Sequence, residues 1–427
     1  MTPSHPPIPR RRWLAAALSA TLLLAACGGG SDSNDHDDEH HVDTLGRLVI
    51  ADGSTTVRVP DLDGGTVVQN YTLDHAPSAL YSSPSHRYAL AVQRTQDQVQ
   101  VIDGGIYQED HGDHLHDYKR NPALLDWRLP GVRPTHYQAH DGLAAFFMDG
   151  LEASSLPAQV VVLTDASIAA RQALASLPLP RAMHGTAEPR GNFLLTTYRE
   201  AGSQSTLPSQ VELYQRNGSG YSFVQRFEEA CPGLHGSYSN ESHSAFGCTD
   251  GVLIVTQDGS SFSTRKLPNP DDMPVDARIG TILGHPERST FIGIASPGHF
   301  FDIDPVAGTL TRINWAEGRT RRAHAMDAQG RHLLILDDQG TLHLLDGHAG
   351  WAVRARLPAI ASMPTAAPFP AIAVNRAANR AYLSDPNGAR IVVVDLDTAT
   401  LATPIALNFN PTLLTWVGIE RHDNHAH

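Results

Sequence analysis

The sequence predicts an all-β protein, a β-propeller of eight four-stranded blades that is closed by a C-terminal strand. Short apolar strands and polar turns recur in units spaced about 40 to 50 residues apart, the range of propeller blades. Within each strand, apolar and polar residues alternate with the period of two that half-buried strands show. The 35 glycines and 29 prolines favour many turns over long helices.

The repeating units can be followed along the chain. Successive units begin near Ser78, Arg133, Met183, Leu234, Arg278, Ala323 and Pro370. The unit at 47–73 lacks its first strand, whereas PTLLTWVGI at 411–419 is a spare strand. We therefore expect the C-terminal strand to complete the first blade, which gives eight blades. Seven blades are the alternative, because the unit at 234–267 is short.

The N-terminus is predicted to be an export signal, residues 1–26. It has a basic start, an apolar stretch too short to span a bilayer, and small residues before Cys27. The sequence LAAC resembles a bacterial lipobox, which predicts cleavage before Cys27 and lipidation of its thiol. An ordinary cleaved signal with an incidental Cys27 is the alternative. Gly28 follows in place of aspartate, so retention in the inner membrane is not indicated, and we expect a periplasmic protein anchored to the outer membrane by its lipid.

The remaining boundaries follow from composition. Residues 27–45 are expected to be a flexible tether rich in histidine and aspartate, 46–420 the propeller, and 421–427 a histidine-rich tail. The net charge of −13 argues against nucleic acid as a partner and is compatible with attraction of cations. We expect a monomer that contacts the membrane only through its lipid.

Export makes the two remaining cysteines, Cys231 and Cys248, interpretable as a disulfide. They bracket PGLHGSYSNESHSAFG, a predicted hairpin whose ends can meet, and the pairing leaves no odd thiol.

Histidine is abundant, with 23 residues, and much of it lies in three clusters. The insertion EDHGDHLHDYKR at 109–120 falls between the third and fourth strands of its blade, and the other two clusters lie at the chain ends. In a propeller closed as predicted, both ends leave on the face where that insertion lies. The clusters are His36, His40 and His41; His111, His114 and His116; and His422, His425 and His427.

Neutral imidazole is a good zinc ligand, and carboxylates complete or orient such sites. Because copper(II) and nickel also bind imidazole, ligand type alone does not select zinc. Binding is expected to weaken below the histidine pKa of about 6.5, since protonated imidazole cannot ligate. The alternative is that the histidine tracts are solvated tails without a ligand.

A second set of histidines occupies one position at the start of several units. The segments RPTHYQAHDG, RAMHGTAEPRG, PGLHGSYSNES and RRAHAMDAQG place there His136, His184, His235 and His324. The first three belong to consecutive blades, and first strands line the central channel of a propeller. They predict a metal site with an open fourth position for water, Glu188 or a partner; the alternative is a polar repeat position bonded to backbone or water. Isolated histidines are expected at the surface or in turns: His86, His285, His299, His332, His343 and His348.

An exported propeller with DHGDHLHDY, then PTHYQAHDG, then CPGLHG…AFGC resembles the AztD family of periplasmic zinc metallochaperones. The resemblance extends over the mature chain and is carried by the combination of motifs. It implies zinc binding and transfer to the solute-binding protein of a zinc ABC transporter. The metal positions that it implies are His111, Asp113, His114, His116, His136, His184 and His235. The lipobox is a departure, because the resemblance implies a freely soluble exported protein.

Two other functional classes are compatible with a propeller. An enzyme of this fold needs a convergent set of acids or a cofactor floor, and the sequence has no obvious set of that kind. A scaffold for a protein partner would leave the histidines incidental. We expect a non-enzymatic zinc protein, and metal analysis would separate it from the scaffold.

Overall fold

The computed structural model describes residues 41–112 and 114–421. The predicted signal peptide, Cys27, His36, His40, Asp113 and the three tail histidines lie outside these residues. Among the residues described, no helix is long and apolar enough to cross a membrane.

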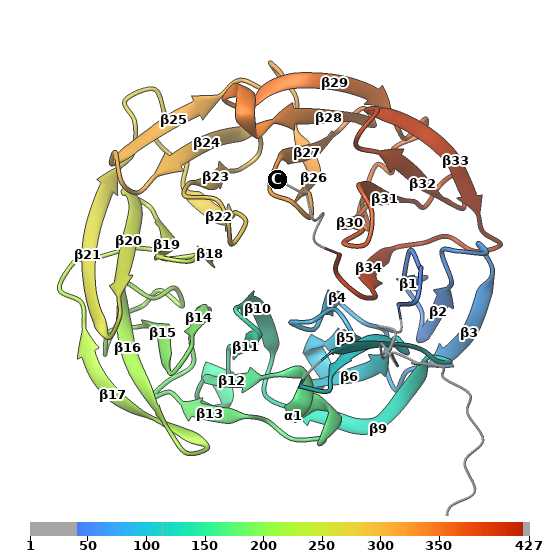
Figure 1. Ribbon diagram of the computed structural model, residues 1–427. Helices are drawn as coiled ribbons and strands as arrows, with labels where there is room; N and C mark the ends of the chain where they lie inside the picture. The colour runs from blue at the N-terminus through green and yellow to red at the C-terminus, as the bar shows by residue number, and fades with distance from the viewer. Residues whose placement is uncertain (1–40, 113, 422–427) are drawn as a thin grey trace, which may run out of the picture. The chain divides into compact units, whose positions relative to one another are not determined.

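The predicted propeller is confirmed. Eight four-stranded antiparallel sheets follow one another around a central channel, and the seven-blade alternative is therefore wrong (Figure 1). The innermost strands of blades one to eight are β34 (Leu413–Val417), β4 (Ala79–Ser82), β10 (Pro134–His140), β14 (Ala187–Arg190), β18 (Ser237–Ser239), β22 (Ile279–Leu283), β26 (Arg321–Met326) and β30 (Ile372–Val374). The second strands are β1 (Arg47–Ala51), β5 (Tyr88–Gln93), β11 (Leu143–Met148), β15 (Phe193–Tyr198), β19 (His243–Cys248), β23 (Phe291–Ala295), β27 (His332–Asp337) and β31 (Arg380–Asp385).

The outer half of each blade has the same order. The third strands are β2 (Thr56–Pro60), β6 (Gln98–Asp103), β12 (Gln159–Leu163), β16 (Gln210–Asn217), β20 (Gly251–Asp258), β24 (His299–Asp304), β28 (Thr341–Asp346) and β32 (Arg390–Asp395). The outermost strands are β3 (Val67–Thr72), β9 (Ala123–Pro130), β13 (Ala175–Pro178), β17 (Gly220–Arg226), β21 (Ser261–Pro268), β25 (Thr309–Ile313), β29 (Ala352–Pro358) and β33 (Thr400–Ala406). One short helix, α1 (Asp165–Ala169), and three 3-10 turns at Arg94–Gln96, Glu152–Ser154 and Gly347–Ala349 lie in connections.

Ring closure occurs as the spare strand predicted. β34 pairs antiparallel with β1, from Arg47 opposite Val417 to Ala51 opposite Leu413. The indole of Trp416 adds a hydrogen bond to the carbonyl of Leu45 at 2.9 Å. The first blade is thus built from both ends of the chain, and no blade edge is left open at the junction.

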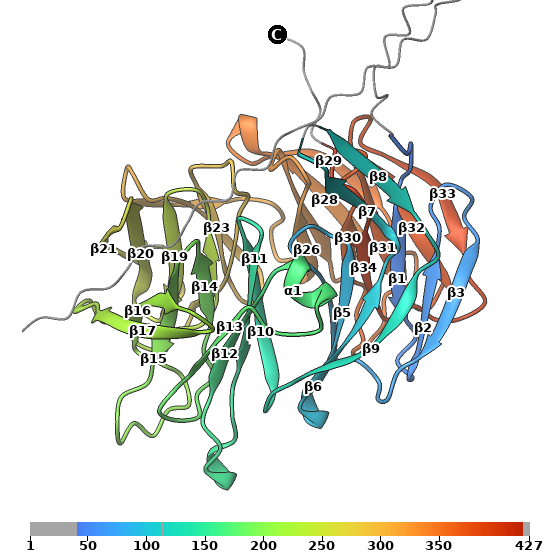
Figure 2. The ribbon, with the colours of Figure 1, turned by 60° about the horizontal axis from the view of Figure 1, so that its bottom comes forward.

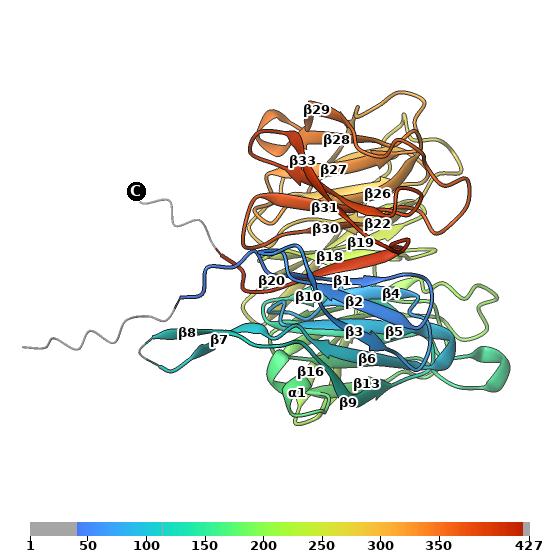
Figure 3. The same cartoon turned by 90° about the vertical axis from the view of Figure 1, so that its right-hand side faces the viewer.

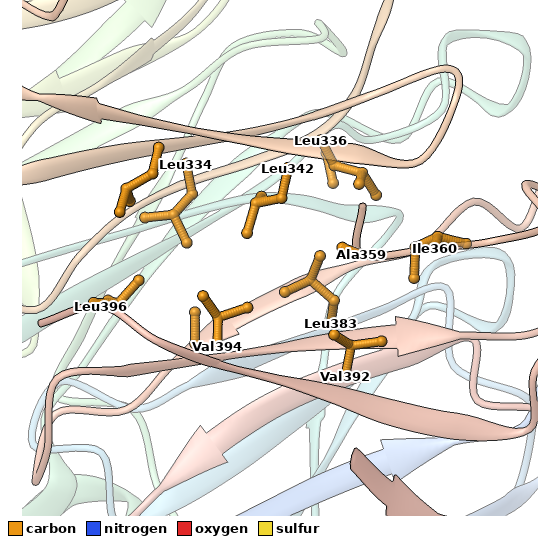
Figure 4. Packing of buried hydrophobic residues seen from close by; sticks show 12 residues of the cluster. Leu334, Leu336, Leu342, Ala359, Ile360, Leu383, Val392, Val394 and Leu396 are labelled. Carbon is orange, nitrogen blue, oxygen red and sulfur yellow. The ribbon is translucent and has the colours of Figure 1, made fainter. Parts of the chain in front are cut away.

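The core is divided among the junctions between blades. The described residues form eight hydrophobic clusters, one for each pair of neighbouring blades. Figure 4 shows the junction of blades seven and eight, where Leu334 and Leu342 face Leu383 and Val394. Second strands such as β5 are buried throughout, whereas the outermost β29 alternates between exposed and half-buried positions. The sequence shows the same contrast, because β5 is almost wholly apolar while β29 alternates arginine with aliphatic residues.

The histidine-rich insertion forms a two-stranded hairpin, β7 (Ile106–Asp110) and β8 (Leu115–Lys119), which projects from one face of the ring (Figures 2 and 3). It lies between β6 and β9 of blade two, as the sequence indicated. Strand order places it on the face that holds the turns between first and second strands. The links that lead into each innermost strand lie on the opposite face.

Candidate metal site

Three side chains from consecutive blades meet where their innermost strands begin. His136 is near the start of β10, His184 precedes β14, and His235 precedes β18. Each offers one ring nitrogen, and these three atoms lie within 4.8 Å of one another. The ring centroids are 4.6, 5.0 and 5.2 Å apart. Within the described part of the chain, this trihistidine site is the only group of three or more metal-binding side chains that converges in this way.

Local backbone features aim these side chains. The pairing of β10 with β11 shifts between Pro134 and His136, an irregularity of the bulge type that re-aims a strand residue. Gly185 is packed tightly between two blades, since a Cβ there would collide with Thr197 of its own blade and with Phe147 of the preceding blade. The carbonyl of this buried glycine accepts a hydrogen bond from His136 Nδ1 at 2.7 Å.

The other two rings are oriented in the same manner. His235 Nδ1 donates to the carbonyl of Gly280 at 2.6 Å, and His184 Nδ1 donates to the carboxylate of Asp149 at 2.9 Å. Because each Nδ1 carries its proton toward an acceptor, each Nε2 presents a lone pair to the others. The Nε2 atoms of His184 and His235 are 3.0 Å apart. Two lone pairs at this distance repel, and a shared cation removes the repulsion.

This arrangement suits zinc. Ligands at 2.0–2.1 Å in a tetrahedral shell are about 3.3 Å from one another, which small rotations of these rings reach. Orientation of each histidine through its other nitrogen is the usual second layer of a zinc site. Cavities of about 310 Å³ beside His184 and about 400 Å³ beside His235 adjoin the site and leave room for a fourth ligand.

Burial favours the neutral form of two of the three ligands, His136 and His235. Burial, followed by the neighbouring His184 and His235, lowers the pKa of His136 to about 4. Burial also lowers the pKa of His235. The hydrogen bond to Gly280 raises this pKa, while His184 and Arg278 lower it further. A neutral imidazole is the form that binds metal, so these two rings need no deprotonation at neutral pH.

Asp149 is the residue that the sequence argument missed. It follows β11 in FFMDG, and its Oδ2 bonds both His184 Nδ1 and Arg94 Nη2 at 2.9 Å. Burial favours a raised pKa, but the hydrogen bonds from His184 and Arg94 hold the pKa of Asp149 below its usual range. The sequence indicated only that an aspartate follows the second strand of this blade. Its contact with a histidine of the next blade depends on blade packing.

Substituting Asp149→Asn should lower zinc affinity about tenfold, because outer partners of ligating histidines contribute 10–100-fold in known sites. The charge that stabilises the oriented His184 is lost, while size and fold are kept. Competition with a chromogenic chelator measures the change. Glu152→Gln is the matched control, since Glu152 lies at the same cavity but pairs with Arg199. Equal affinity of the Asp149 variant and wild type would show that this carboxylate does not support the site.

The hairpin brings its three histidines near one another, but less tightly. Ring centroids are 5.3 Å apart for His111 and His114, 5.7 Å for His111 and His116, and 6.5 Å for His114 and His116. The backbone N–H of His111 donates to the carbonyl of His114 at 3.0 Å and closes the turn. His114 and His116 are half-buried and His111 is exposed, whereas all three residues of the trihistidine site are half-buried.

The described ends of both terminal segments meet at the root of the hairpin. The buried Asp117 carboxylate accepts hydrogen bonds from Val42 N at 2.9 Å, Gln108 Nε2 at 2.9 Å and Arg421 Nη2 at 2.5 Å. His41 Nδ1 lies 3.4 Å from the same carboxylate. The expected convergence of the chain ends and the insertion on one face is thus present in the described residues. The trihistidine site lies on the opposite face.

The structure also shows where two other residues singled out in the sequence lie, Glu188 and His324. Glu188 is not beside the three histidines, because its carboxylate lies deeper, where it accepts a hydrogen bond from Ser239 at 2.8 Å. His324 occupies the equivalent position in blade seven, but its neighbours carry no histidine there, and its Nδ1 instead contacts Arg321 at 2.8 Å.

The expectation of surface or turn positions was wrong for two isolated histidines. His332 and His343 lie within strands β27 and β28 and are buried, with 7 and 3 % exposed area. His285 is also buried, but it begins a turn in which its carbonyl accepts a hydrogen bond from the N–H of Arg288. His332 bonds Asp327 at 2.9 Å and His343 bonds Asp337 at 3.0 Å. These carboxylates supply the hydrogen bonds that let a histidine lie inside a blade. Separately, the predicted disulfide joins Cys231 to Cys248.

Fold and site together define a class: an eight-bladed propeller with an open trihistidine site at one mouth of its channel. No protein-family model matches the chain. The chain is similar to the zinc chaperone AztD of Citrobacter koseri, with 27% identity over 396 residues that cover 90% of each protein. The resemblance to AztD that the motifs indicate is confirmed.

Solved structures agree with this similarity in fold. The structure of apo AztD from Citrobacter koseri has a TM-score of 0.75 at 24% identity, and covers 88% of this chain and 98% of that chain. A further crystal structure of Citrobacter koseri AztD gives the same TM-score and identity, with 89% and 99% covered. The dihydro-heme d1 dehydrogenase NirN is a more distant likeness, with a TM-score of 0.55 at 15% identity over 89% and 77%.

Proposed function

We propose that this protein is an exported zinc metallochaperone that holds zinc and passes it to the solute-binding protein of a zinc ABC transporter. The observation that carries the proposal is the convergence of three oriented histidine rings, with room for a fourth ligand. An open position suits a carrier, because a partner's ligand can enter before the others leave. Similarity to a zinc chaperone over 90% of the chain supports the same function.

The two histidine sets have different roles in this proposal. The trihistidine site, built on packed blades, holds zinc firmly. The hairpin histidines His111, His114 and His116 form a weaker and more accessible site. Asp113 and the histidines of both chain ends, His36, His40 and His41 among them, add ligands on the hairpin face.

The proposed location is the periplasm, with the lipid on Cys27 anchoring the chain to the outer membrane. Support comes from the basic, apolar and small-residue order before Cys27 and from the Cys231–Cys248 disulfide, which suits an oxidising compartment. The protein is proposed to act as a monomer without catalysis.

The function is tested in two stages. Metal-free protein is first titrated with zinc at neutral pH by calorimetry, and absence of uptake would contradict zinc binding. Zinc-loaded protein is then mixed with a metal-free zinc solute-binding protein in the presence of a chelator. Delivery predicts that zinc reaches the partner faster than the chelator collects it. Equal capture by the chelator with and without partner would leave a zinc-holding protein and remove the delivery role.

The pH dependence of His136 is a further expected result. In metal-free protein its ring should titrate near pH 4, so that protonation of His136 weakens zinc binding only well below the ordinary histidine range. Histidine Cε1–H signals followed by NMR between pH 8 and 3.5 measure this. His184→Ala removes the second cause of the shift and should raise the pKa of His136. Titration of His136 near 6.5 in wild type would show that its ring is hydrated and not held in the site as described.

A further inference from the structure

A column of polar side chains continues from the trihistidine site into the wall of the channel. Two residues beyond His184 and His235, the hydroxyls of Thr186 and Ser237 are 2.7 Å apart. Two residues further, Ser239 Oγ donates to Glu188 Oε2 at 2.8 Å. All four of these residues are buried. Two hydroxyl groups therefore separate a buried carboxyl group from the metal ligands.

Glu188 lacks a direct counter-charge. Its Oε1 is buried and has no hydrogen-bond partner among the described residues. Arg190 is nearby, but its guanidinium is directed elsewhere: Nη1 donates to Asn240 O at 2.9 Å and Nη2 to Glu241 O at 2.6 Å. A buried carboxylate that is neither paired nor fully hydrogen-bonded is costly, and protonation relieves the cost.

The surroundings do not supply another proton at neutral pH. The titratable groups that interact with Glu188 are Arg190 on β14 and Tyr238 on β18, and His140 at the end of β10 interacts in turn with Arg190. On β15, the uncharged Leu195 lies opposite Glu188. Burial lowers the pKa of His140 to about 4 and raises that of Tyr238 to about 12, so both rings are neutral. Burial raises the pKa of Glu188 to about 7. Ser237, Ser239 and Arg190 favour the charged carboxylate and lower this pKa, but their effect is smaller than that of burial.

We infer that Glu188 loses a proton when zinc binds at the trihistidine site, and that its carboxylate then balances part of the zinc charge. The inference rests on the proposed zinc binding. The O–H bond of the carboxyl breaks, the proton passes to buffer, and no electron is transferred. Four extended residues place Glu188 roughly 13 Å from the site. A divalent charge at that spacing lowers a carboxyl pKa by about one pH unit or more.

Proton release during zinc titration tests this. Metal-free protein is titrated with zinc at pH 7 in a weak buffer with a pH indicator, alongside Glu188→Gln. A fall of about one pH unit in this pKa releases about 0.4 proton per zinc at pH 7, so wild type should release that much more than the variant. Protons from zinc-bound water are common to both proteins and cancel in the difference. His140→Gln is the matched control and should release as many protons as wild type.

The zinc affinities of wild type and Glu188→Gln, compared at two pH values, provide a second test. At pH 8.5 wild-type Glu188 is charged and attracts zinc, so Glu188→Gln should bind about tenfold more weakly. At pH 5.5 both side chains are neutral and the affinities should converge. Equal proton release, or a ratio that does not change with pH, overturns the inference. Glu188→Asp, which keeps the carboxyl, should restore part of the difference and excludes a folding defect. Failure of wild type to bind zinc at all would instead refute the proposed function.

Discussion

Replacing His136, His184 and His235 together with alanine should lower zinc affinity about a thousandfold, because each lost ligand costs about tenfold. The fold should persist, since the three side chains are only partly buried and lie outside the hydrophobic clusters. Chelator competition measures affinity, and circular dichroism with thermal melting checks the fold. His348→Ala removes an exposed histidine that the site does not use and should leave affinity unchanged.

The hairpin variant decides between the two histidine sets. Substituting His111, His114 and His116 with alanine should leave the tight site and remove weaker binding. It should also slow zinc transfer to the solute-binding protein, because the accessible hairpin histidines can exchange ligands with the partner one at a time. If this variant loses tight binding while the trihistidine variant keeps it, the primary site lies on the hairpin face and the roles proposed above are reversed.

Loss of the disulfide is the second large effect expected. Cys231→Ser combined with Cys248→Ser should lower the free energy of unfolding by about 3 kcal/mol, because the bridge closes a loop with a sequence separation of 17. Both cysteines are fully buried between blades four and five, so the serines also place unpaired hydroxyls in an apolar cluster. Urea unfolding at fixed pH provides the measurement.

The disulfide is also expected to affect zinc binding, because it holds the segment that carries His235. Cys231 lies four residues before His235, whose backbone N–H bonds the carbonyl of Gly247 at 2.9 Å, next to Cys248. We expect the double variant to bind zinc more weakly as well as to unfold earlier. Wild type under reducing conditions is the control and should move in the same direction. An unchanged unfolding free energy in both cases would mean that blade packing alone fixes this segment.

Much of the fold could be predicted because propeller blades repeat in sequence. The starts near Arg133, Leu234 and Arg278 each fall within three residues of the innermost strand. The spare strand at 411–419 could be assigned to the first blade, because the unit at 47–73 has only three strands. The histidines aligned because equivalent positions in consecutive blades face one another across the junctions.

Other features depended on contacts that no local pattern encodes. Asp149 reaches His184 across a blade junction, and Asp117 gathers Val42 and Arg421 from opposite ends of the chain. The buried positions of His332 and His343 were missed because pairing with an aspartate, rather than polarity, decides whether a histidine can be enclosed. The placement of the two histidine sets on opposite faces follows from strand direction once the blades are known.

The pairing of β34 with β1 in blade one joins the two ends of the propeller by backbone hydrogen bonds, so the linear chain forms a closed ring. During synthesis, the inner edge of β1 stays unpaired until residues 413–417 emerge, so the ring cannot close before nearly the whole chain has been made. A chain that stops short of this strand presents that edge to other molecules, which favours aggregation. In the closed ring neither β1 nor β34 can separate alone, because detaching either strand breaks the same five-residue pairing. The first and the last strand of the propeller therefore stabilise each other, and we expect the eight blades to unfold together.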